Sequence, residues 1–263
     1  MQSDYSLTSI APTISQVMGL RPPRQAESPP IAEAADGLEG AGRLALIILD
    51  AFGLATWQAH RAAAPTFDAL AAGGCLTLRS VLPCKTPVCF ATIASGAEPA
   101  VHSVRKRQDE MKAETVFHVL REQKRTSAVA GRDASSARIV LSRFADFARV
   151  AASNTDEEVL ALALDVVATK TPDFLLVQFL DIDNAGHRAG PGSPESRQAV
   201  ADTDRRLASL LDALTHHGYA ALVTADHGQH DRRGEDGRVR GGHDGSATED
   251  LLVPLTWRGA EKE

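Results

Sequence analysis

The sequence is poor in residues that would assign it to several specialised classes of protein. Only three of its 263 residues are cysteine, Cys75, Cys84 and Cys89, an odd number without CxxC spacing. Neither a disulfide framework nor a structural zinc site is therefore indicated, and the thiols are typical of a reducing, cytosolic compartment. Aromatic residues make up 5% of the chain, so no platform for stacking bases is visible.

Long apolar runs and an excess of positive charge are also missing. No apolar run approaches the roughly 20 residues that cross a bilayer, and the N-terminus lacks a basic segment followed by an apolar stretch. The formal net charge of -6 argues against a nucleic-acid polymer as a partner, because such a partner needs a basic face. We therefore expect a cytoplasmic protein without a membrane partner. Its oligomeric state stays open.

The composition that is present suits a packed globular protein. Apolar residues make up 43% and charged residues 24% of the chain, and its length favours one large domain. Residues 1–20 read as an N-terminal segment with one docked helix, because apolar side chains recur at helical spacing from Ile10 to Leu20. Residues 21–42, rich in Pro, Ala, Glu and Gly, have the composition of a linker. Residues 43–263 remain as the main globular domain.

Three continuous apolar runs in that domain each end in acidic residues. They are Leu44–Leu49 before Asp50, Phe174–Leu180 before Asp181 and Asp183, and Ala220–Thr224 before Asp226. Such runs are typical of strands buried on both faces of a parallel sheet. Helical patterns separate them at residues 114–123, 156–168 and 195–214. The alternation predicts an α/β fold with a doubly wound, mostly parallel sheet flanked by helices, whose sites lie beyond the carboxyl ends of the strands.

Carboxylates and imidazoles gather after these strands. Together they are Asp50, Asp183, Asp226, His187, His227 and His243, with Asp183 and His187 in a predicted loop and His243 among glycines. Zn²⁺ or Mn²⁺ accepts such a mixed set of oxygen and nitrogen ligands, and six ligands are enough for two ions. Taken alone, Asp50 is explained as well by a turn or N-cap, and His243 by a surface loop. The prediction of a metal site therefore depends on the joint pattern.

At this point the residues resemble the alkaline phosphatase superfamily, and within it the nucleotide pyrophosphatase/phosphodiesterase branch. The similarity runs from about residue 44 to 257. It consists of Leu49-Asp50-Ala-Phe-Gly53, Pro83-Cys-Lys-Thr86-Pro87, Thr92-Ile-Ala-Ser-Gly96, Asp183-Asn-Ala-Gly-His187-Arg-Ala-Gly-Pro191, Thr224-Ala-Asp226-His227-Gly228 and Gly242-His243. The resemblance implies an alkaline phosphatase-like fold and a metal-dependent hydrolase of phosphate esters.

The resemblance also implies the role of each residue. One metal is expected on Asp183, His187 and His243, and a second on Asp50, Asp226, His227 and the oxygen of Thr86. Thr86 is then the nucleophile, because coordination to a cation lowers the pKa of its hydroxyl, and a phosphothreonine intermediate follows. If Thr86 begins a helix, its backbone amides are suited to hold phosphoryl oxygens. Zn²⁺ is the first expectation for both ions and Mn²⁺ the second.

Several charged residues near these motifs are weaker candidates. Lys85, Arg105 and Arg107 are substrate-binding candidates, although a short basic run is more often a solvated face. Asp181, His230 and Asp244 flank the ligands, and we considered them as groups that orient the imidazoles.

The chain also departs from the pattern of the family's larger members. The segment from Leu7 to Gly19 is similar to a helix that follows the last metal motif in those members, which suggests a circular permutation. That hypothesis requires residues 8–19 to pack near residues 251–257. No large insertion for a cap domain is present, which favours hydrolysis over mutase action, and a sulfatase motif is lacking.

The preferred function is thus a phosphodiesterase or nucleotide pyrophosphatase acting on small phosphate esters. A phosphomonoesterase or a phosphonate hydrolase of the same superfamily is the alternative. A non-catalytic metal-binding protein is a weaker alternative, because a decayed site usually loses some of its ligands.

Overall fold

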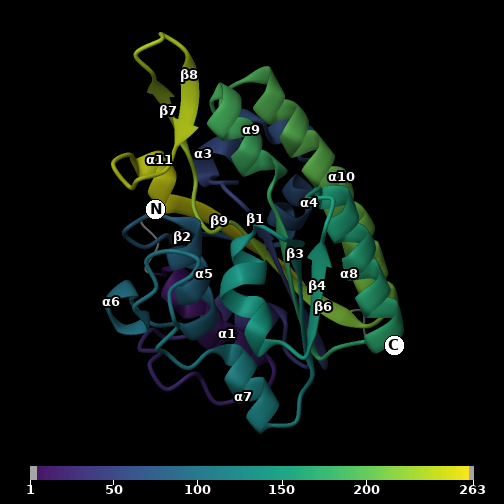
Figure 1. Cartoon of the computed structure of the whole chain (residues 1–263). Coiled ribbons are helices and arrows are strands. Elements are labelled where there is room, and N and C mark those ends of the chain that lie inside the picture. Colours follow the sequence, from purple (N-terminus) through teal and green to yellow (C-terminus); the bar gives the residue numbers. More distant parts are fainter. Residues whose placement is uncertain (1–4, 261–263) are drawn as a thin grey trace.

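The chain folds around one seven-stranded sheet with helices on both faces (Figure 1). The structure is a computed structural model that describes residues 5–260; residues 1–4 of the predicted N-terminal segment and 261–263 of the predicted main globular domain lie outside the described residues. The strands of the sheet are β1 (Arg43–Leu49), β2 (Cys75–Arg79), β3 (Ser127–Arg132), β4 (Phe147–Ala151), β5 (Phe174–Phe179), β6 (Tyr219–Thr224) and β9 (Leu252–Arg258).

The strand order is β2-β9-β6-β1-β5-β3-β4. β9 runs antiparallel to both of its neighbours, β2 and β6, and all other neighbouring strands are parallel. The predicted α/β fold with a mostly parallel sheet is therefore confirmed. β1, β5 and β6 are the three strands predicted from apolar runs, and they lie next to one another at the centre. Because all three are parallel, their acidic carboxyl ends share one edge of the sheet.

Two layers of helices cover the sheet. On one face α10 packs against α4, α8 and β6, and on the other α1, α5 and α7 pack against one another (Figure 1). The helices are α1 (Ile10–Val17), α2 (Ala32–Gly37), α3 (Leu54–Ala59), α4 (Pro65–Gly73), α5 (Thr86–Ser95), α6 (Pro99–His102), α7 (Val116–Glu122), α8 (Asp156–Lys170), α9 (Asp181–Ala189), α10 (Pro194–His216) and α11 (Thr248–Leu251). The three predicted helical segments correspond to α7, α8 and α10.

A two-stranded hairpin of β7 (His230–Arg233) and β8 (Val239–Gly242) projects from the sheet beside α9 (Figure 1). No large cap domain is present in residues 5–260. Within the same range, no helix has both the length and the apolar character needed to span a membrane.

The segment between α1 and β1 is packed more closely than its composition suggested. It contains the short helix α2, and its Ile31 and Leu38 are buried in the core. Arg21 binds Glu114 with an Nη1–Oε2 distance of 2.7 Å. Residues 21–42 connect α1 to β1 in sequence, and they also hold α1 against the rest of the protein.

The position of α1 bears on the permutation hypothesis. Its main neighbours are α2, α5 and α7, whereas β9 packs chiefly against β2, β6 and the helices α2, α3, α4 and α11. The required packing of residues 8–19 beside 251–257 is therefore not among the principal contacts of α1. The arrangement does not support a circular permutation. It shows that α1 supports α5, the helix that begins at Thr86.

Candidate active site

The predicted site residues meet at the carboxyl ends of the central strands. Asp50 follows β1, Asp226 and His227 follow β6, and Thr86 is the first residue of α5. Asp183 and His187 belong to α9, not to the loop that the sequence suggested, so that expectation was wrong. The helix serves the same purpose, because side chains four residues apart lie on one helical face.

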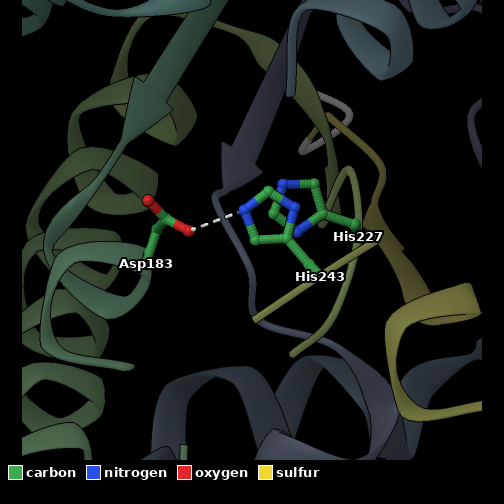
Figure 2. A group of neighbouring side chains, drawn as sticks. All are labelled: Asp183, His227 and His243. Carbon is green, nitrogen blue, oxygen red and sulfur yellow. Dashed lines mark ion pairs between the residues drawn. The ribbon is translucent and has the colours of Figure 1, made fainter. Parts of the chain in front are cut away.

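Asp183, His187 and His243 form one close group. The Nε2 atom of His187 lies 3.2 Å from Oδ1 of Asp183 and 3.2 Å from Nε2 of His243, and the latter lies 3.8 Å from the same Asp183 oxygen. Figure 2 shows the Asp183 carboxylate facing the ring of His243, with the ring of His227 behind that of His243. Three ligand atoms therefore converge on one point.

Asp50, Asp226, His227 and Thr86 form the second group. The Nε2 atom of His227 lies 3.6 Å from Oδ1 of Asp50, 3.3 Å from Oδ2 of Asp226 and 3.1 Å from Oγ1 of Thr86. Both carboxylates are fully buried, and these two oxygens are among the few buried side-chain atoms of the described chain without a hydrogen-bond partner. An unpartnered buried carboxylate is costly, and a bound cation would remove that cost.

The two groups touch through a pair of histidines. The rings of His227 and His243 are stacked, with centroids 3.9 Å apart and planes 12° from parallel (Figure 2). As a result Asp183, His227 and His243 also offer ligand atoms within 4.8 Å of one another. His227 thus lies between the two expected metal positions and touches both groups, although the sequence assigned it to one.

All three imidazoles are held in the same tautomer. Each Nδ1 lies near a backbone carbonyl oxygen, 2.9 Å from Cys84 for His243, 3.0 Å from Gly241 for His187 and 3.1 Å from Gly228 for His227. Because a carbonyl only accepts, each Nδ1 carries a hydrogen, and Nε2 is the nitrogen left to face the site; at His187 the Asp183 carboxylate raises the pKa of the ring, so a cation would displace a proton from that Nε2. This is the arrangement in which histidine binds a metal.

Burial sets the protonation of the site. Desolvation, followed by the charge of Asp183, raises the pKa of Asp226 to about 8. Desolvation and the charges of Asp226 and Asp183 also raise the pKa of Asp50 well above its usual range. Desolvation lowers the pKa of His227 to about 3, so its ring stays neutral. The site without a cation therefore retains protons that a cation would displace.

Two glutamines that sequence reasoning missed hold the carboxylates. The Nε2 of Gln178 donates to Oδ2 of Asp50 at 2.5 Å, and the Nε2 of Gln229 donates to Oδ1 of Asp183 at 2.7 Å. Gln178 was the one polar residue in the apolar run of β5, and Gln229 directly follows the Asp-His-Gly motif. These positions in the sequence were the signals from which the two glutamines could have been identified.

Glycines make room for these contacts. A Cβ atom on Gly186 would overlap Oε1 of Gln229, and a Cβ on Gly241 would lie 2.7 Å from the same oxygen. Likewise, a Cβ on Gly53 would overlap the backbone of Gly228. The glycines of the motifs are therefore explained by the close approach of α9, β8 and the segments that follow β1 and β6.

The flanking residues have roles different from those we expected. Asp181 binds Arg132 and Arg206, His230 binds Asp250 with an Nδ1–Oδ1 distance of 2.8 Å, and Asp244 binds Arg232. Across residues 5–260, none of the three is hydrogen-bonded to a ligand imidazole, so the prediction that they orient the imidazoles was wrong. Lys85, Arg105 and Arg107 do line the cleft that contains Thr86 and His243.

Comparison with known proteins places these motifs in a family. A family model described as type I phosphodiesterase / nucleotide pyrophosphatase matches residues 103–241, just over half of the chain. The matched range contains the Asp183–His187 and Asp226–His227 motifs. Thr86 and Asp50 precede it and His243 follows it.

Curated relatives match over short stretches. The chain is 39% identical over 72 residues to a 2,3-bisphosphoglycerate-independent phosphoglycerate mutase of Herpetosiphon aurantiacus, covering 27% of this chain and 13% of that protein. It is 36% identical over 69 residues to venom phosphodiesterase 2 of Crotalus adamanteus, covering 25% of this chain and 8% of that protein. The chain therefore spans a small part of the length of these relatives.

Solved structures share the fold over most of the chain. Phosphonoacetate hydrolase from Sinorhizobium meliloti 1021, in complex with phosphonoformate, has a TM-score of 0.62 at 22% identity, covering 76% of this chain and 59% of that one. Murine ectonucleotide pyrophosphatase / phosphodiesterase 5 has a TM-score of 0.60 at 17% identity, covering 72% and 58%. The zinc complex of the C-terminal periplasmic domain of EcEptC from Escherichia coli has a TM-score of 0.59 at 16% identity, covering 84% and 74%. These similarities confirm the alkaline phosphatase-like fold.

The contact between Gly186 and Gln229 predicts a non-additive pair of substitutions. Gly186→Ala should displace Gln229 from Asp183 and weaken metal binding about 10- to 100-fold, as losses of groups that orient a ligand usually do. In a Gln229→Ala background the same change should cost nothing further, because the clash is gone and alanine favours a helix. Metal titration by calorimetry on the four chains tests this. Equal losses from Gly186→Ala in both backgrounds would contradict the stated contact.

The raised pKa of Asp226 predicts how stability depends on pH. Its pKa is about 8 in the folded chain and about 4 in the unfolded chain, so the metal-free protein should lose stability as the pH rises from about 4 to about 8, and the loss should level off above that. Stabilisation by Zn²⁺ or Mn²⁺ should grow over the same range, because a cation needs the ionised carboxylate. Thermal unfolding with and without chelator measures both trends. In Asp226→Asn the loss should be smaller, and an identical loss there would show that another group is responsible.

Proposed function

The chain belongs to the type I phosphodiesterase / nucleotide pyrophosphatase family, and from this premise we propose that it hydrolyses small phosphate esters, preferentially diesters, with Thr86 as the nucleophile. One observation carries the proposal. The Thr86 hydroxyl begins α5 and lies 3.1 Å from Nε2 of His227, beside the unpartnered oxygens of Asp50 and Asp226. A hydroxyl, a neutral imidazole and two carboxylate oxygens without a hydrogen-bond donor, gathered at one buried point, are suited to phosphoryl transfer.

The donor set fits two divalent cations. Asp183, His187 and His243 would hold one, and Asp50, Asp226 and His227 would hold the other together with the oxygen of Thr86. Zn²⁺ is our first choice and Mn²⁺ the second, since both accept mixed oxygen and nitrogen ligands. When bound, such ions lower the pKa of a coordinated hydroxyl and stabilise charge on phosphoryl oxygens.

The chain's own residues would carry out the reaction in two displacements. In the first, Oγ1 of Thr86 bonds to phosphorus as the bond to the leaving alcohol breaks; the hydroxyl proton passes to solvent, and the leaving oxygen takes a proton from solvent. The result is a phosphothreonine. In the second, water attacks phosphorus and Thr86 leaves with a proton. The N–H of Thr86 has no partner within α5, so it is suited to hold a phosphoryl oxygen throughout.

A phosphonate hydrolase or a phosphomonoesterase is the second candidate. It is favoured by the structural similarity to phosphonoacetate hydrolase and by the basic residues that line the cleft. A non-catalytic metal-binding protein is the weakest candidate, because every predicted ligand and the nucleophile reach the site. The cytoplasmic location expected from the reduced thiols stays a proposal.

Removing the nucleophile separates catalysis from binding. Thr86→Ala should lower turnover of bis-p-nitrophenyl phosphate by at least about 10³-fold, the size of effect expected for loss of a covalent nucleophile. Binding of two metal equivalents should survive, because six ligands remain. Thr86→Ser, which keeps a hydroxyl, is the matched control and should retain part of the activity. Full activity in Thr86→Ala would refute the assigned role.

Metal removal tests the remaining part of the proposal. Protein treated with chelator should lose turnover, and Zn²⁺ or Mn²⁺ should restore it. The restored protein should hydrolyse bis-p-nitrophenyl phosphate faster than p-nitrophenyl phosphate. A preference for the monoester would move the assignment to a phosphatase, and turnover that is insensitive to chelation would refute metal dependence.

A further inference from the structure

A group of cations forms one rim of the catalytic cleft. The cleft has a volume of about 350 Å³ and is lined by Thr86, His187 and His243. The same cleft is also lined by the group that we call the basic rim, namely Lys85, Arg105, Lys106 and Arg107. This concentration is notable in a chain whose formal net charge is -6.

The loop that carries most of the basic rim is held in place. The buried ring of His102 lies 3.1 Å from Oγ1 of Thr92 in α5 and accepts the N–H of Val104 through Nδ1 at 3.1 Å. A carboxylate oxygen of Asp109 accepts the N–H groups of Arg105 and Lys106 at 2.8 and 3.0 Å. Since α5 begins at Thr86, the loop is fixed relative to the nucleophile.

The charged ends of the basic rim are available for a ligand. None of its four side chains has a carboxylate within ion-pair distance in the described range 5–260. The Nε of Arg107 donates to Ser136 at 3.3 Å and one terminal nitrogen of Arg105 donates to Pro99, which leaves the other guanidinium nitrogens open. A guanidinium anchored in this way presents a fixed fork that matches a carboxylate or phosphate.

The charge of the rim exceeds what the reacting phosphoryl group requires. Two divalent cations would already neutralise the three carboxylates of the site and add one positive charge, which balances the single charge of a phosphate diester. Arg107 is near enough to Asp50 to act on it through its charge, and the other cations of the rim add charge beyond this balance. They are suited to a second anionic group on the same substrate.

We propose that the basic rim is a second anion subsite, which selects phosphate esters carrying a carboxylate or a further phosphate group outside the reacting phosphoryl group. The inference rests on the proposed function, since it names the class of substrate for that reaction. It assigns Arg105 and Arg107 to specificity, and Thr86 with its metal ligands to chemistry.

Three matched diesters test the subsite. Each contains a p-nitrophenyl group, and the second ester group is 4-carboxyphenyl, 4-phosphonophenyl or the neutral 4-carbamoylphenyl. The metal-loaded wild type should favour at least one charged diester over the neutral one by about tenfold in kcat/KM, roughly the value of one charge-assisted hydrogen bond. Which charged diester is preferred distinguishes a carboxylate from a phosphate.

Substitution should then remove the preference. In Arg105→Gln combined with Arg107→Gln, the ratio of charged to neutral kcat/KM should fall to near one. The control is Lys124→Gln combined with Lys170→Gln, which removes two exposed charges without touching the cleft and should keep the wild-type ratio. A ratio near one in the wild type, or an unchanged ratio in the arginine variant, overturns the proposal.

If no diester is hydrolysed, the proposed function is refuted. A binding measurement would then still test the subsite. Calorimetry would then compare 4-carboxybenzylphosphonate with 4-carbamoylbenzylphosphonate on the metal-loaded protein. The charged phosphonate should bind about tenfold more tightly to the wild type than the neutral one, and equally to the arginine variant. Equal binding of both phosphonates to the wild type overturns the subsite.

Discussion

Two buried carboxylate oxygens, Oδ1 of Asp50 and Oδ2 of Asp226, constrain the rest of the active site. Each lies at the end of a central strand with no hydrogen-bond donor, which would cost several kcal/mol if both were ionised without a counter-charge. The raised pKa values of both groups express that cost. A core of largely apolar strands compensates for it, because β1, β5 and β6 bury nearly every side chain. On our proposal, bound cations would satisfy these oxygens, and the fold maintains the site in readiness for them.

The groups around these two oxygens leave them without a hydrogen-bond donor but hold the other candidate ligand groups of the site in place. Gln178 donates to the other oxygen of Asp50, and Gln229 donates to Asp183. Three backbone carbonyls fix the imidazoles so that each Nε2 faces inward. The segments that provide these groups, α9 among them, lie so close together that Gly186 and Gly228 have no room for a Cβ. Preorganisation of this kind reduces the rearrangement needed when cations and substrate bind.

The central sheet and the ligands could be predicted from the sequence because both depend on local patterns. Apolar runs identify buried strands, and acidic residues directly after parallel strands must share an edge. Gln178 and Gln229 could not be predicted, because their role depends on distances between segments far apart in the sequence. Residues 183–187 were expected in a loop because they follow directly after a buried strand, but they belong to the helix α9, although Asn184 and Gly186 are poor helix formers. Tertiary contacts outweighed that propensity: Gly186 is required by Gln229. The packing of α1 on α5 likewise leaves no local signal.

The motifs that identify the family lie at the bottom of the cleft, and the basic rim lies at its edge. Residues at the bottom contact the phosphoryl group, which is the same in every substrate of such a hydrolase, so they determine the reaction and not the substrate. Residues of the rim reach the part of the substrate that differs. Membership of the family therefore says little about Arg105 or Arg107, and their anchoring to α5 through His102 and Thr92 says more. The substrate of this protein is accordingly to be sought among phosphate esters with a second negative charge.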